Sequence, residues 1–157
     1  MIVKMRPLLA LGFSAALVLP ITAQATDPED AIEYRQSALR VMAFQIGPLG
    51  DMAQGNIDYD ADEFALRANN LASLAHLPWE AFIEGSLQGD DHGVDTDALA
   101  KIGDEWDGFR ERQETFQQES ATLAQMVDDG EEFNALRRQV GAVANSCKAC
   151  HDDYRAD

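Results

Sequence analysis

The residues with the clearest chemical potential lie near the C-terminus, where the sequence reads Cys147-Lys148-Ala149-Cys150-His151. Cys147 and Cys150 are three residues apart and Cys147 and His151 are four apart, so on a helix all three side chains project from one flank. This C-x-x-C-H spacing is typical of covalent c-type haem attachment. The two thiols add to the haem vinyl groups while the imidazole reaches the iron from the same side. The motif therefore predicts one haem c, attached through Cys147 and Cys150, with His151 as the iron ligand.

Three other kinds of site use similar residues. A thiol-disulfide oxidoreductase normally places its C-x-x-C pair at a helix N-terminus beside a βαβ unit, where the dipole lowers a thiol pKa. A structural zinc site needs four ligands, and only His76 and His92 could complete one. Both of these histidines also fit ordinary surface or helix-end positions. A plain disulfide between the two cysteines is the third alternative.

Length and charge narrow the class of protein. The chain has 157 residues, which suits one domain. It carries 12 Lys and Arg against 28 Asp and Glu, for a formal net charge of −16. Nucleic acid is therefore excluded as an expected partner, because its phosphates attract clustered basic residues. An acidic surface is compatible with simple solubility or with a basic redox partner.

The first residues have the pattern of a secretory signal peptide. Two basic residues precede an apolar run over 8–19, and 23–25 reads Ala-Gln-Ala, an A-x-A cleavage signal. The run is shorter than the roughly 20 residues that span a bilayer. We expect a signal peptide over 1–25 and a haem domain over 26–157, exported to the periplasm and not inserted in the membrane.

Four apolar-periodic segments follow, and strand signals are nearly absent. The first three are expected over 28–54, from 60 to Pro78, and from 96 or 97 to 128, and the fourth follows Gly130 to about Tyr154. Pro48 should kink the first or end it early. The predicted fold is all-α, an antiparallel up-down-up-down four-helix bundle.

Some details of this pattern are less regular. The stretch 83–93 is rich in Gly and acidic residues and predicts a loop. The apolar stripe of the third helix includes Trp106, Phe109 and Phe116, which we expect to face the core. Gln113 and Ser120 interrupt this stripe, where they either face a cofactor or weaken the packing between helices.

The motif and two further segments, 34–39 (Tyr-Arg-Gln-Ser-Ala-Leu) and 77–82 (Leu-Pro-Trp-Glu-Ala-Phe), together resemble the cytochromes c prime, the class II c-type cytochromes. The resemblance extends over 28–155. It implies a dimeric, periplasmic bundle with five-coordinate, high-spin haem iron and His151 as its only protein ligand. Leu39 then matches the residue over the open face of the iron, where an alkyl group can only crowd an arriving ligand.

The resemblance also assigns roles to other residues. Arg35 and Gln36 lie at the haem propionates, and Arg155 lies on the proximal side. The expected aromatic walls of the haem pocket are Trp79, Phe82, Phe109 and Phe116. Spacing alone favours Leu39 as a core leucine, and only the resemblance assigns it the place over the iron. Without the resemblance, Arg35 is equally an arginine that reaches the surface.

Two further features bear on the site. Met42 or Met52 could ligate the iron only in a shifted register, and both are expected to pack as core. In the family the tryptophan of the third helix stands about two turns before the first phenylalanine, whereas here Trp106 precedes Phe109 by three residues.

These observations predict a haem protein that binds small diatomic gases, nitric oxide and carbon monoxide, and not an enzyme. No acid-base constellation suited to peroxide cleavage is evident. The alternative is a one-electron carrier that exchanges electrons with a periplasmic redox partner.

Overall fold

The computed structural model describes residues 26–156, and the signal peptide predicted over 1–25 lies outside them. Its elements, in chain order, are α1 (Pro28–Gln54), α2 (Ala61–Leu74), the 3₁₀ turn η1 (Trp79–Ala81), α3 (Lys101–Asp104), α4 (Trp106–Asp128) and α5 (Phe133–Tyr154). Within these residues the only β pairing is one isolated bridge between Ala98 and Arg155. No helix in this part of the chain is both long and apolar enough to span a bilayer.

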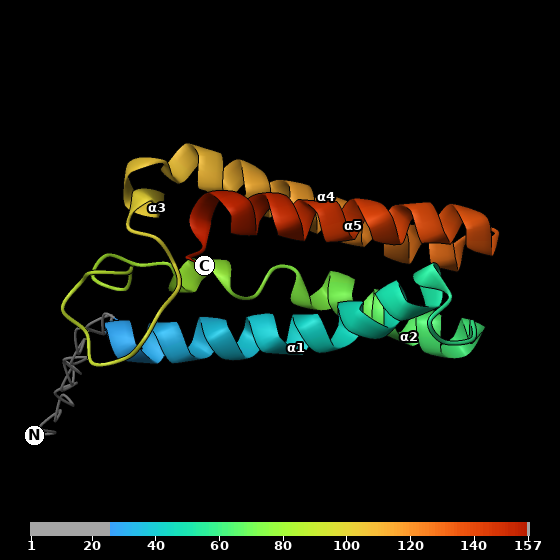
Figure 1. Ribbon diagram of the computed structural model, residues 1–157, viewed down its shortest axis with the longest axis horizontal. Coiled ribbons are helices and arrows are strands. Elements are labelled where there is room, and N and C mark those ends of the chain that lie inside the picture. Colours follow the sequence, from blue (N-terminus) through green and yellow to red (C-terminus); the bar gives the residue numbers. More distant parts are fainter. Residues whose placement is uncertain (1–25, 157) are drawn as a thin grey trace, which may run out of the picture.

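The four long helices lie side by side and alternate in direction along the long axis of the molecule (Figure 1). α1 contacts α2 and α5, and α4 contacts the same two helices, so the four form a closed ring. This is the predicted antiparallel up-down-up-down bundle. α3 and the long connection before it lie at the end of the bundle where α5 finishes (Figure 1).

Local capping explains where the first two helices begin. Asp27 accepts a hydrogen bond from the backbone N–H of Glu29, and Pro28 occupies the first helical turn. Asp60 likewise accepts from the N–H of Glu63. α1 then ends at Gly55, whose φ of 78° is the left-handed conformation that glycine adopts readily.

Neither Pro48 nor Pro78 marks the residue at which a helix ends. Pro48 lies inside α1 and does not end it early, since the helix continues to Gln54. α2 ends at Leu74, before Pro78, and its last turn is closed by the Ala75 N–H donating to Leu71.

The predicted start of the third helix at 96 or 97 is wrong. Residues 97–99 are not helical, because their backbone groups bind other segments: the Ala156 N–H donates to Asp97, and the Leu99 N–H donates to Tyr154. A short helix, α3, follows, and the long helix begins only at Trp106. These tertiary hydrogen bonds satisfy the groups that a helix would otherwise pair internally.

The core occupies the centre of the bundle. Its buried members include Leu49, Phe64, Leu71, Leu123 and Val143, contributed by all four long helices. A second cluster of Ile102, Phe109 and Tyr154 lies at the α3 end. Burial of these apolar side chains provides the main favourable free energy of folding.

Candidate haem site

One cavity of about 600 Å³ lies between α1, α4 and α5. Its volume falls within the range of roughly 300–1,000 Å³ that small-molecule and cofactor sites occupy. All eleven predicted site residues line it: Arg35, Gln36, Leu39, Trp79, Phe82, Phe109, Phe116, Cys147, Cys150, His151 and Arg155. The structure therefore brings together residues from opposite ends of the sequence around a single hollow.

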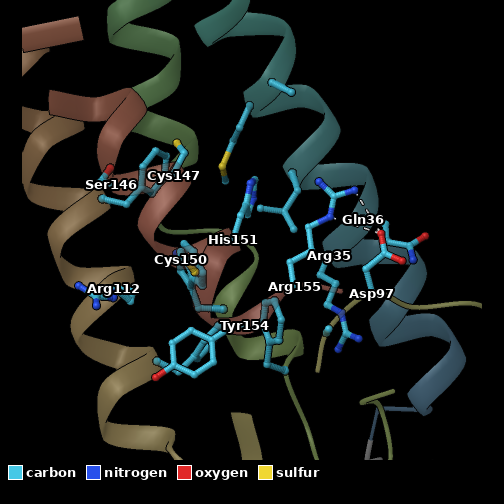
Figure 2. Close-up of a pocket in the computed structure, with 18 of the residues that line it drawn as sticks. Arg35, Gln36, Asp97, Arg112, Ser146, Cys147, Cys150, His151, Tyr154 and Arg155 are labelled. Carbon is cyan, nitrogen blue, oxygen red and sulfur yellow. Dashed lines mark hydrogen bonds and ion pairs between the residues drawn. The ribbon is translucent and has the colours of Figure 1, made fainter. Parts of the chain in front are cut away.

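α5 supplies the motif side chains. The helix is regular through Tyr154, so Cys147, Cys150 and His151 emerge from one flank and face the space toward α1 (Figure 2). Both cysteines are free thiols, and each is partly buried at the cavity wall. The imidazole of His151 is exposed to the hollow. Two thiols and one imidazole thus line the same wall.

The electrostatics differ from those of a redox-active thiol pair. Burial raises the pKa of Cys147, and burial together with the neighbouring Cys147 raises the pKa of Cys150 to about 11. A catalytic C-x-x-C pair needs the opposite shift, and it normally lies at a helix N-terminus. Here both thiols lie in the last two turns of α5. The thiol-disulfide oxidoreductase alternative therefore lacks its electrostatic basis.

His151 has the protonation state that metal ligation needs. Partial removal of its ring from water, together with the nearby Arg155 guanidinium, lowers the pKa of His151 from its usual 6.5. The imidazole is therefore neutral at pH 7 and keeps a nitrogen lone pair for a metal.

The other two histidines lie apart from this site. Neither His76 nor His92 lines the cavity. The Nε2 of His92 is 2.8 Å from the Leu87 carbonyl oxygen, within its own loop. Across residues 26–156, no three His, Cys, Asp or Glu side chains converge in a metal-holding arrangement. The geometry gives the zinc alternative no four-ligand site.

The α1 wall of the cavity is mostly alkyl. Leu39 is partly buried and packs against the core, and Met42 and Ile46 line the cavity beyond it. Met42 is 4% exposed and belongs to the core cluster. Leu39 has neither a lone pair nor a hydrogen-bond donor, so this wall can exclude or admit a ligand but cannot bind one to a metal.

Arg35 lies fully inside the protein, on the same wall of α1. Its guanidinium donates to the Ala81 carbonyl, to the carbonyl and hydroxyl oxygens of Ser86, and to the Thr96 hydroxyl. It also lies 4.6 Å from the centroid of the Phe82 ring. Burial lowers its pKa to about 10, which leaves it cationic at neutral pH. All these partners are uncharged, so a cofactor carboxylate near the cavity edge would suit this cation.

The segment 95–99 crosses the end of the cavity as a strap between α1 and α5. On one side, Gln36 donates to the Asp95 carbonyl at 2.8 Å. On the other, Arg155 pairs with the Asp97 carboxylate at 3.3 Å (Figure 2). Gln36 and Arg155 therefore help to fix the strap as well as lining the site.

Aromatic rings close the remaining side. Phe109 is 4.7 Å from Phe82 and 5.9 Å from Trp79, and Trp79 is 6.3 Å from Phe116, all measured between ring centroids. The indole N–H of Trp79 donates to the Ala75 carbonyl, so its polar edge is satisfied. The rings together form a largely water-excluding wall, as a flat apolar cofactor requires.

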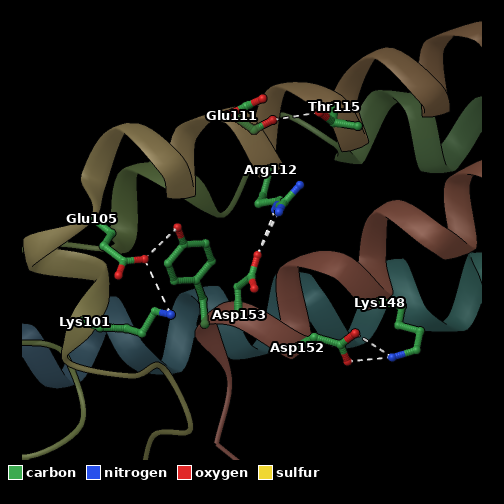
Figure 3. Close-up of polar contacts among 9 residues, drawn as sticks. Lys101, Glu105, Glu111, Arg112, Thr115, Lys148, Asp152 and Asp153 are labelled. Carbon is green, nitrogen blue, oxygen red and sulfur yellow. Dashed lines mark hydrogen bonds and ion pairs between the residues drawn. The ribbon is translucent and has the colours of Figure 1, made fainter.

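Polar contacts fix the end of α5 that carries the motif (Figure 3). Arg112 of α4 pairs with Asp153 at 2.9 Å, and Lys148 pairs with Asp152 along α5 itself. The Tyr154 hydroxyl lies 3.4 Å from a carboxylate oxygen of Glu105. Of these contacts, the Arg112–Asp153 pair links the end of α5 to α4 beside the cavity.

Sequence reasoning missed twelve lining residues: Arg40, Met42, Ala43, Ile46, Leu71, Thr96, Asp97, Ala98, Ile102, Arg112, Ser146 and Tyr154. Met42 and Ile46 continue the helical stripe from Leu39, so spacing could have identified them. Thr96 and Asp97 come from the irregular strap, where no periodicity gives a signal.

Gln113 and Ser120, the two polar residues that interrupt the apolar stripe of the third helix, do not line the cavity. Ser120 Oγ is buried without a hydrogen-bond partner in the described structure.

The residues fit a covalently attached haem. Two thiols and a neutral imidazole share one wall, aromatic and alkyl groups form the others, and a buried cation lies at the edge. Cys147 and Cys150 would form the two thioethers, His151 would ligate the iron, and Arg35 would face a propionate.

Replacing Arg35 with Met tests its structural role in the holoprotein. The change leaves several buried acceptors unpaired, so the free energy of unfolding should fall by about 3 kcal/mol in denaturant titrations. Arg110→Met is the matched control, because Arg110 is exposed on α4 and does not line the cavity. It should change stability by less than about 0.5 kcal/mol. Equal effects of the two changes would contradict the role assigned to Arg35.

Known proteins provide an independent comparison. The family model described as Cytochrome C' matches residues 30–155. A cytochrome c' from Halomonas halodenitrificans is 78% identical over 131 residues, covering 83% of this chain and 99% of that relative. One from Alcaligenes xylosoxydans xylosoxydans is 38% identical, covering 84% of this chain and 98% of its own.

Solved structures of cytochromes c prime also match the fold of this chain. Cytochrome c prime from Shewanella frigidimarina superposes with a TM-score of 0.78 at 39% identity, covering 85% of this chain and 100% of that one. A nitric oxide complex of a leucine variant from Alcaligenes xylosoxidans gives 0.74 at 36% identity, covering 85% and 99%. With the bundle, the C-terminal motif and these matches in agreement, the chain belongs to the cytochrome c' family of haem proteins.

Proposed function

We propose that this protein is a periplasmic gas-binding cytochrome c', with five-coordinate, high-spin haem iron that takes up nitric oxide and carbon monoxide. Cys147 and Cys150 hold the haem covalently, and His151 is the only protein ligand. The leader over 1–25 directs export and is removed. When bound, the haem supplies an iron whose sixth position can accept a diatomic molecule.

The observation that carries this proposal is the contrast between the two helical walls of the cavity. α5 presents a neutral imidazole, whereas α1 presents the alkyl side chain of Leu39. Leu39 cannot ligate iron, so it leaves the sixth position to a small ligand that is able to displace the side chain. Met42 also lines the cavity, and its place in the packed core favours its role as a core residue over that of a ligand.

Relatives support gas binding. Solved structures of cytochrome c prime from Alcaligenes xylosoxidans include nitric oxide complexes of leucine variants and of an arginine variant. Dioxygen is a poorer candidate, because the side chains of Leu39, Met42 and Ile46 on the α1 wall cannot donate a hydrogen bond to a bound oxygen molecule. The proposed role is binding and not turnover.

Optical spectra of the reduced holoprotein provide the direct test. The expected spectrum is high-spin and shifts when nitric oxide or carbon monoxide is added, because the sixth position is open. A low-spin spectrum that neither gas changes would overturn the proposal and would favour Met42 as a sixth ligand, with electron transfer as the function.

Leu39→Ala tests the steric gate. If displacement of the isobutyl group contributes about 1.4 kcal/mol to the barrier, carbon monoxide should associate about tenfold faster in flash photolysis. Ile57→Ala is the control, since Ile57 is exposed to solvent and does not line the cavity. Association rates that do not differ between Leu39→Ala and the parent would refute the gate.

We also propose that the protein forms a homodimer through an apolar surface made by Val41 and Phe44 of α1 and Leu66 of α2. These side chains are 47%, 67% and 57% exposed, respectively. Val41 and Phe44 are three residues apart on α1, and Arg67, next to Leu66, lies 5.1 Å from the centroid of the Phe44 ring. Exposed apolar groups that lie near one another commonly mark interaction sites.

Phe44→Glu places a charge on this surface, so sedimentation velocity should report a monomer. Ile57→Glu is the control, because Ile57 is an exposed apolar residue beyond the end of α1 and should leave the dimer intact. A Phe44→Glu protein that sediments as a dimer would place the interface elsewhere.

A further inference from the structure

A second hollow of about 390 Å³ lies at the α3 end of the bundle, directly behind the haem cavity. Phe82 and Ile102 line both hollows, so at these positions the wall between them is one side chain thick. Trp106, the first residue of α4, lines only the second one. We call this feature the Trp106 groove and define it by Phe82, Glu84, Asp90, Ile102 and Trp106.

Trp106 provides an aromatic connection from the surface to the haem cavity. Its side chain is 38% exposed, and its ring centroid lies 5.7 Å from that of Phe109. Phe109 is only 2% exposed and lines the haem cavity. Two adjacent rings thus lead from solvent to the cofactor site. The predicted helix stripe placed Trp106 in the core, but in the structure its ring lies on the surface.

The surroundings of Trp106 are acidic. Glu84 and Asp90 line the groove, and both are exposed. Asp104, Glu105 and Asp107 flank the tryptophan in the chain and are exposed as well. The nearby Lys101 is paired with Glu105 at 3.5 Å, which partly neutralises each of these two charges.

The haem cavity lacks such a concentration of carboxylates. Arg40, Arg112 and Arg155 line it, and Asp97 is the one acidic residue among its lining residues. Arg155 is paired with Asp97 and Arg112 with Asp153. A basic protein that approached the molecule would therefore be attracted to the groove more strongly than to the cavity. Charge complementarity of this kind steers encounter and fixes orientation.

We propose that the Trp106 groove is the docking surface for a basic one-electron carrier protein, and that Trp106 and Phe109 connect this surface to the haem. One electron leaves the reduced metal centre of one protein and reduces the oxidised centre of the other, and no atom or proton is transferred. The inference rests on the haem site proposed above but not on gas binding.

Binding is tested with the holoprotein and a basic cytochrome c as the probe, in a ¹⁵N NMR titration at low salt. The indole N–H signal of Trp106 should shift, and that of Trp79, which is bonded inside the protein to Ala75, should not. An unchanged Trp106 signal at saturating probe would overturn the docking surface.

Charge variants locate the site. Asp104→Asn with Asp107→Asn should slow oxidation of the ferrous holoprotein by the ferric probe about tenfold at low ionic strength, and added salt should remove the difference. Asp128→Asn with Glu131→Gln removes the same charge at the other end of α4 and should change the rate less than twofold. Equal slowing by both pairs would show general charge attraction and no specific surface.

Trp106→Leu and Trp106→Phe separate docking from the electron path. Loss of the ring in the leucine variant should slow electron transfer within the complex several-fold, whereas phenylalanine should retain most of the rate. Equal rates in all three proteins would refute the path. The nitric oxide spectrum of each variant serves as a control for an intact haem site. If the parent protein shows no haem spectrum, the proposed function is wrong. If the parent binds nitric oxide normally but does not bind the basic cytochrome c, only the docking surface is wrong.

Discussion

The site depends on the helical periodicity of α5. Cys147, Cys150 and His151 share one flank only while the helix stays regular, and it does so through Tyr154. The neighbouring helix accommodates this end of α5 closely, since a Cβ on Gly108 would lie 2.6 Å from the Tyr154 hydroxyl oxygen. A side chain at Gly108 would force Tyr154 to move, so glycine allows α4 and α5 to approach at this end.

Different helices contribute different groups to the site. α5 carries the two cysteines and the histidine proposed to hold the haem, whereas α1 carries Leu39 and the buried Arg35. Because these groups lie on different helices, the packing of the bundle determines the spacing between the two walls.

Sequence patterns predicted the parts that local forces determine. α1 and α5 followed from their apolar stripes, and the eleven candidate residues that line the cavity followed from the C-terminal motif and the family resemblance. The start of α4 could not be predicted, because tertiary hydrogen bonds from Tyr154 and Ala156 hold 97–99 out of a helix. For the same reason Asp97 gave no signal, and Trp106 was assigned to a buried stripe although it lies at the surface.

The manner in which Arg35 holds the 81–96 connection has an evolutionary consequence. Two of its four acceptors are the backbone carbonyls of Ala81 and Ser86, which every amino acid possesses. Mutations that alter the side chains of this connection can therefore accumulate while half of the anchoring interactions persist. Divergence between related proteins should concentrate in this connection, whereas a change at Arg35 itself would remove all of its contacts in a single step.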